Sequence, residues 1–135
     1  MTYPLSQIEG MTAFAASKLK KLGIRTTDAL LEAAHTAKGR RDLSAKSGIS
    51  EQQLLEWANI CDYMRIPGMG KASAGLLRAA GVMTVRELAL RNPARLAKAF
   101  AEVNKSRKLV RVLPDEQNIT DLIWRAKTSP SKVEQ

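Results

Sequence analysis

The stretch Ile66-Pro67-Gly68-Met69-Gly70-Lys71 decides the expected fold, because it predicts a tight hairpin between two helices. Glycine takes positive φ and allows close backbone approach more easily than other residues, and here two glycines flank the apolar Met69. Residues 71–80 then have a helical pattern, and Gly81 is placed to end that helix. A helix start that follows such a turn and carries a lysine can bind an anion. The sequence therefore predicts a phosphate contact at this turn.

The hairpin pattern occurs twice in the chain. A shift of 58 residues places residues 5–30 over residues 63–88, and eight of these 26 pairs are identical. The identical pairs are Ile8/Ile66, Gly10/Gly68, Met11/Met69, Ala16/Ala74, Leu19/Leu77, Gly23/Gly81, Thr26/Thr84 and Leu30/Leu88. This internal similarity predicts two copies of one supersecondary unit that bury their apolar faces against each other.

The second copy carries a pattern that is found in a known motif. From Ile66 to Leu77, hydrophobic-x-Gly-Met-Gly-x-x-x-Ala-x-x-Leu resembles the helix-hairpin-helix motif. The first copy, residues 10–16, is similar but has Thr12 in place of the second glycine. The chain from about residue 3 to residue 127 also resembles a bacterial family catalogued as domain of unknown function 4332. The residues that carry this second resemblance are Tyr3-Pro4-Leu5-Ser6-Gln7-Ile8-Glu9-Gly10, Gly48-Ile49-Ser50-Glu51 with Trp57, and Met64-Arg65-Ile66.

The resemblance implies an all-α fold in which two helix-hairpin-helix units pack as a pseudo-two-fold repeat, similar to the helical bundle of SAM domains. Helix-hairpin-helix proteins usually bind duplex DNA without sequence preference, through hairpin backbone amides and a nearby basic side chain. The resemblance therefore implies duplex DNA as a partner. Some such hairpins hold a monovalent cation on their carbonyls, and the sequence leaves that question open. We expect no other cofactor and no metal site.

Cap residues and apolar spacing predict helices along the whole chain. Thr12, Ser50, Thr84 and Asn92 stand where helix N-caps are expected, and Asp115 precedes the last helix. We expect residues 1–64 to form a structural first unit with a degenerate hairpin and residues 65–127 to form a basic second unit. Residues 128–135 are polar, contain Pro130, and are predicted to be a disordered tail.

Positive charge is concentrated in the second unit. The net charge is +9 and the pI is about 10.1, which favours a polyanionic partner; the alternative is a solvated surface that only keeps the protein soluble. Residues 1–64 have a net charge of +1 and residues 65–135 a net charge of +8. At the first hairpin, Glu9 would repel phosphate, and the hydroxyl of Thr12 can satisfy the helix amides itself.

We therefore expect the DNA contact at the second hairpin and the basic residues near it. The candidate nucleic-acid-binding residues are Gly68, Met69, Gly70, Lys71, Ser73, Arg78, Lys105, Arg107, Lys108 and Arg111.

The sequence does not favour an enzyme, because it lacks paired carboxylates, a Cys/His pair, metal-ligand spacing and a phosphate-binding loop. His35 is isolated, and Cys61 belongs to an apolar helix stripe. The six aromatic residues form no stacking platform for single strands, so duplex DNA is the better polyanion. One cysteine and no signal or membrane-spanning segment predict a cytoplasmic or nucleoid-associated protein without a membrane partner. The alternative function is a protein-protein interaction or scaffold domain that keeps the fold without binding DNA.

Overall fold

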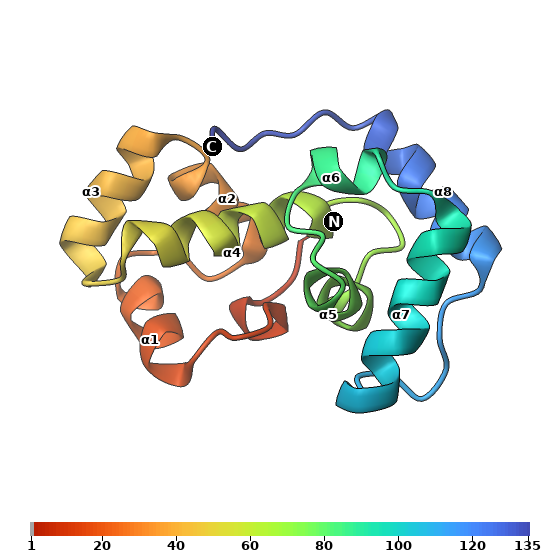
Figure 1. The fold of residues 1–135 in the computed structure, drawn as a ribbon. Coiled ribbons are helices and arrows are strands. Elements are labelled where there is room, and N and C mark those ends of the chain that lie inside the picture. Colours follow the sequence, from red (N-terminus) through yellow and green to blue (C-terminus); the bar gives the residue numbers. More distant parts are fainter. Residues whose placement is uncertain (1) are drawn as a thin grey trace.

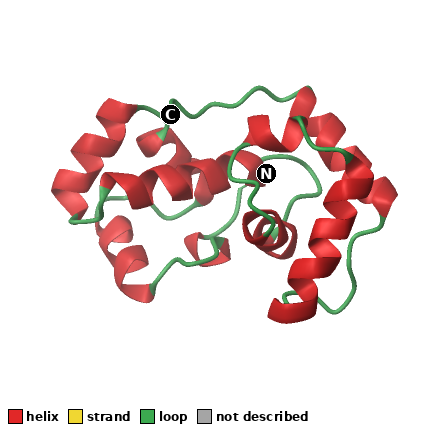
Figure 2. Ribbon diagram, viewed as in Figure 1, coloured by secondary structure: helices red, strands yellow, loops and turns green. Residues whose placement is uncertain are grey.

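The computed structural model describes residues 2–135, and this part of the chain is all-helical, which confirms the expected fold class (Figures 1 and 2). The elements are a short 3-10 turn η1 (Leu5–Gln7) and the helices α1 (Ala13–Lys21), α2 (Thr27–Ala34), α3 (Ala37–Ser47), α4 (Glu51–Met64), α5 (Lys71–Ala79), α6 (Val85–Ala89), α7 (Pro93–Arg107) and α8 (Glu116–Lys127). Within residues 2–135, extended pairing is limited to an isolated bridge between Pro4 and Thr26. None of the described helices is both long and apolar enough to cross a bilayer.

Helix α4 runs through the middle of the molecule and joins its two ends (Figure 1). At one end α2 and α3 pack against α4 and against each other, and α1 contacts η1 and α3. At the other end α6 and α7 pack against α8, and α5 packs against α7. Because α4 also contacts α5 and α6, neither end is separated from the other by a linker.

Side-chain caps explain where most helices begin. An N-cap side chain accepts a hydrogen bond from the backbone N–H three residues later and so satisfies one of the free amides of the first turn. The residues that do this are Thr12, Thr26, Thr36, Ser50, Thr84, Asn92 and Asp115. The predicted caps at Thr12, Ser50, Thr84 and Asn92 are therefore confirmed.

One continuous core connects the two ends of the molecule. It includes Leu5 and Ile8 from the first hairpin segment, Ile66 and Met69 from the second, and Leu54 from the central helix, all at most 1% exposed. The two units expected from the sequence thus share their hydrophobic core, which is the main favourable contribution to folding.

The local structure of the two copies agrees at several positions. Helices α1 and α5 are displaced by 58 residues at both ends. Gly10 and Gly68 have φ of +85° and +88°, and Gly23 and Gly81 both have φ of +85°. The pseudo-two-fold packing of the whole units stays a prediction.

Residues 129–135 have a defined position, so the expectation of a disordered C-terminal tail is wrong for them. The sequence predicts a disordered tail here, whereas the structure places this segment in an extended path from the end of α8 across the molecule to α2, α3 and α4 (Figure 1). We call residues 129–135 the strap. Within the strap, Val133 is 8% exposed and belongs to the hydrophobic core.

Candidate functional site

The second hairpin is a tight turn held by Met69. The Met69 side chain is fully buried, and its N–H donates to the Ile66 carbonyl across the turn at 3.0 Å. Gly68 takes the left-handed conformation that the turn requires. The Tyr3 hydroxyl donates to the Met69 carbonyl at 2.6 Å, so the start of the chain holds this turn in place.

The N-terminus of α5 differs from those of the other α-helices because its N-cap, Gly70, has no side chain to accept a hydrogen bond. Within residues 2–135, the N–H groups of Lys71, Ala72 and Ser73 make no hydrogen bond. A Cβ built on Gly70 would meet no atom within 4 Å, so the space in front of this helix start is open. The arrangement leaves free amide donors beside the exposed side chain of Lys71.

Two depressions flank this helix start. One, of about 340 Å³, is lined by Glu9, Lys71, Ala72, Gly75 and Leu109. The other, of about 230 Å³, is lined by Gly68, Ser73, Pro114, Asn118, Leu122 and Arg125. The segment between α7 and α8 contributes to both depressions, so it runs beside the first turn of α5.

The last turn of α7 and this segment carry four of the predicted basic residues. Lys105 and Arg107 are in the last turn of α7, and Lys108 follows in the left-handed conformation with φ of 49°. Lys105, Arg107, Lys108 and Arg111 are all exposed. Asn104 fixes the turn after the helix, because its side chain exchanges hydrogen bonds of 3.1 and 3.0 Å with the backbone of Val110. Leu109 of this segment lines the depression beside Lys71, and the four predicted residues are exposed just before and after it, on a backbone that Asn104 fixes.

Arg78 has a different position from the other predicted residues. It is in the last turn of α5, where its guanidinium donates to the Glu9 carbonyl at 3.0 Å and to the Glu56 carboxylate at 3.1 Å. These bonds join the first hairpin, α4 and α5. Arg78 thus connects the two units inside the protein rather than facing the open start of α5.

Glu9 places a carboxylate in the depression beside Lys71. Its Oε2 atom is buried without a hydrogen-bond partner, and it lies 2.7 Å from the position that a Cβ on Gly75 would occupy. Gly75 thus leaves room for this carboxylate. An anion in the same depression weakens any attraction for phosphate there, so the first hairpin reduces the positive potential of the second.

Sequence reasoning missed Arg125. Its guanidinium donates to the Pro67 carbonyl at 2.9 Å and lies 2.8 Å from where a Cβ on Gly68 would be. Arg125 therefore adds a cation to the second hairpin. Arg125 lies 58 residues from Pro67, and no local pattern in the sequence connects the two.

The cysteine thiol, the buried tyrosine hydroxyl and the histidine lie outside the candidate site at the start of α5. Burial raises the pKa of the Cys61 thiol far above its ordinary value, and the carboxylates of Asp28 and Asp62 raise it further. Burial likewise raises the pKa of the Tyr63 hydroxyl, although Arg78 lowers it in part. His35 caps the end of α2 through a 2.8 Å contact between its Nδ1 and the Glu32 carbonyl, as expected for a surface residue. In residues 2–135, no three side chains of His, Cys, Asp or Glu are grouped as a metal site.

Comparison with protein families gives one match. The family described as domain of unknown function (DUF4332) matches residues 9–129, which include both hairpins, the free start of α5 and the basic segment. No curated protein and no solved structure matches the chain significantly. Since the match covers most of the length of the chain, the chain belongs to the DUF4332 family.

Proposed function

We propose that this protein is a small non-catalytic module that binds duplex DNA without sequence preference through its second hairpin. The two hairpins are interpreted as helix-hairpin-helix units, of which the first is structural and the second makes the contact. The observation that carries the proposal is the start of α5, the one α-helix in residues 2–135 without a side-chain N-cap. Its free amides suit a phosphate oxygen.

The charges around α5 support a duplex as the polyanion. Lys71 is at the first position of the helix; Arg107 ends α7, and Lys108 and Arg111 lie on the segment that follows it. Phosphate contacts of this kind position a protein on DNA and carry no sequence information. We leave Arg78 out of the proposed contact, because both its terminal nitrogens already donate to acceptors of the same chain, on Glu9 and Glu56.

The test changes the helix start without changing the fold. Gly70→Thr copies the first hairpin and gives the free amides an internal acceptor; Gly70 has extended φ and open space, so Thr fits. We expect Gly70→Thr to weaken binding of a random-sequence duplex about three- to tenfold in fluorescence anisotropy. Lys71→Glu should weaken it at least about tenfold, since it places an anion at a helix N-terminus. Thermal unfolding should change little, because Thr and Gly are similar N-caps.

The matched control is the double variant Lys20→Glu, Lys21→Glu in α1. It reverses two exposed charges in the unit that we interpret as structural. The double variant Arg107→Glu, Lys108→Glu makes the same charge change beside α5, and should reduce affinity far more. Equal losses for the two double variants would leave only general electrostatic attraction and would contradict the site.

A protein-protein interaction or scaffold role is the second candidate function. The buried, unpaired carboxylate oxygen of Glu9 beside Lys71 favours it, since an anion there opposes phosphate. Exposed apolar side chains at Leu90 and Trp124, 77% and 64% exposed, also suit a protein partner. If no duplex is bound even at low salt, this function replaces the first.

A further inference from the structure

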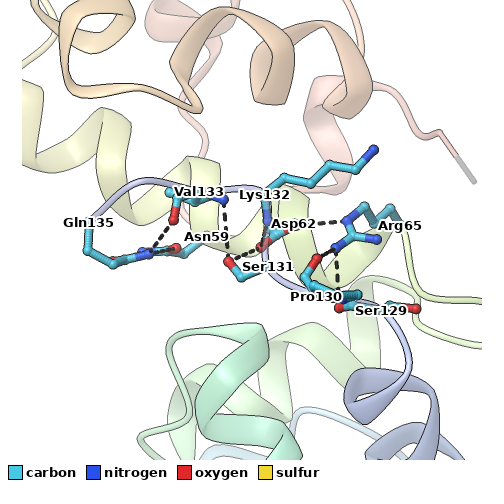
Figure 3. A network of polar contacts seen from close by, with 9 residues as sticks. All are labelled: Asn59, Asp62, Arg65, Ser129, Pro130, Ser131, Lys132, Val133 and Gln135. Atoms are coloured by element: carbon cyan, nitrogen blue, oxygen red, sulfur yellow. Dashed lines mark hydrogen bonds and ion pairs between the residues drawn. The ribbon is translucent and has the colours of Figure 1, made fainter.

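The strap occupies a groove on the opposite unit from the helix that precedes it. It leaves α8 and lies along α2, α3 and α4, where nine residues form a network of polar contacts (Figure 3). Three buried polar side chains face it: Arg40 from α3, and Asn59 and Asp62 from α4, which are 4%, 5% and 1% exposed. Buried polar groups are costly unless they have partners, and the strap both covers these three side chains and supplies partners to them.

Each buried side chain has a partner on the strap, and Asp62 also accepts from the Nε of Arg65 at 2.8 Å. Asp62 accepts from the Ser131 hydroxyl at 2.7 Å and from the Lys132 N–H at 3.2 Å. Arg40 donates to the Glu134 carbonyl at 2.6 Å and, with its other terminal nitrogen, to the Ala34 carbonyl at 2.9 Å. Asn59 and the Gln135 side chain exchange two amide hydrogen bonds (Figure 3).

Most of this contact is made with the strap backbone. The Glu134 N–H donates to the His35 carbonyl at 2.7 Å, and Arg65 donates to the carbonyls of Ser129 and Pro130. Val133 is the one strap side chain that is buried. Backbone hydrogen bonds combined with one apolar anchor are the usual means by which proteins bind extended peptides.

The groove and the strap differ in their relation to the family. Arg40, Asn59 and Asp62 lie inside the matched range 9–129, whereas residues 130–135 lie beyond it. The side chains that hold the strap therefore lie within the family match, whereas most of the strap lies beyond it. Because the groove binds the strap mainly through backbone hydrogen bonds, it can also bind another extended segment with similar side chains.

We propose that the groove over α2, α3 and α4 is a docking site for an extended peptide from a partner protein, and that the strap is its competitor within the chain. The partner segment has the chemistry of the strap: a hydroxyl side chain, then any residue, an aliphatic side chain in the position of Val133, and an acidic residue. Docking of the partner segment displaces residues 129–135. This interaction is independent of DNA binding at α5.

The experiment uses the full chain and a labelled peptide with the sequence of residues 129–135. In the wild-type chain the tethered strap competes at an effective concentration on the order of millimolar, so the peptide should bind only at about that concentration or above. A full-length Ser131→Ala, Val133→Asp variant loses the hydroxyl bond and the apolar anchor of the strap but keeps the groove. We expect this variant to bind the peptide at least about tenfold more tightly in fluorescence anisotropy.

Two controls locate the binding. The peptide with Asp at the position of Val133 should not bind, and Asn59→Ala added to the strap variant should weaken binding of the unchanged peptide. If the double substitution unfolds the chain, Ser131→Ala alone loses one bond and should show an intermediate affinity. The proposal would be overturned if the strap variant keeps its helical circular dichroism spectrum but does not bind the peptide. A wild-type dimer that the free peptide dissociates would also overturn it, because the strap would then occupy the groove of a second copy.

Discussion

Glu9 is the residue whose position most affects the electrostatics of the proposed DNA contact. Its carboxylate lines the same depression as Lys71, and one of its oxygens is buried without a partner. We predict that Glu9→Gln raises duplex affinity about two- to tenfold at low salt, because it removes an anion beside the free amides of α5. Anisotropy titrations of both proteins with one duplex measure this change. The control is Glu51→Gln, an exposed glutamate at the start of α4. Equal effects of the two substitutions would show that only net charge matters.

Cys61 and Tyr63 predict how stability depends on alkaline pH. Burial raises the pKa of both groups in the folded protein, so above about pH 9 the unfolded state binds fewer protons than the folded state. The free energy of unfolding should therefore fall as the pH rises, by about 1.4 kcal/mol per pH unit from Cys61 alone. Urea unfolding between pH 8 and 10 measures this slope.

The matched variants separate the two groups. Cys61→Ala should flatten the fall between about pH 9 and 10, and Tyr63→Phe should flatten it only above about pH 10. Each variant lowers stability at neutral pH, so the slope and not the absolute value is compared. An unchanged slope in Cys61→Ala would show that the thiol does not stay protonated in the folded protein.

At the scale of helices, the sequence predicts what is determined locally. Thr12, Ser50, Thr84 and Asn92 act as caps because the side chain and the amide that it satisfies are three residues apart. The hairpin at Gly68 was predictable for the same reason, since its positive φ requires glycine or a substitute. The free start of α5 could likewise be read from the sequence, because Gly70 has no side chain that can cap it.

Contacts between distant segments could not be predicted in this way. The polar composition of residues 128–135 predicts a disordered tail, yet the strap is hydrogen-bonded to Arg40, Asn59 and Asp62, which are about 70 to 94 residues away. The sequence also does not predict the contacts of Arg78 with Glu9 and of Arg125 with Pro67, since only the folded chain brings these residues together. Sequence patterns report local geometry, and these side chains are positioned by tertiary packing.

At the scale of the whole molecule, the two hairpins are linked in both directions. Tyr3, before the first hairpin, donates to Met69 in the second, and Arg78, after the second, donates to Glu9 in the first. Together with the continuous core, these bonds fix the basic second unit relative to the nearly neutral first unit. The net charge of +8 on residues 65–135 is therefore held in a fixed position relative to the first unit, which favours a polyanionic partner.

The most direct test of duplex binding by the second unit is a salt titration of the wild-type chain with a random-sequence duplex. Lys71 and the basic residues 105–111 should neutralise about three to five phosphates, and each contributes roughly −0.9 to the slope of log K against log salt. We predict a slope of roughly −3 to −4, a dissociation constant on the order of 10⁻⁴ to 10⁻⁶ M at physiological salt, and equal affinity for unrelated sequences. An affinity that does not change with salt, or that depends strongly on base sequence, would contradict it.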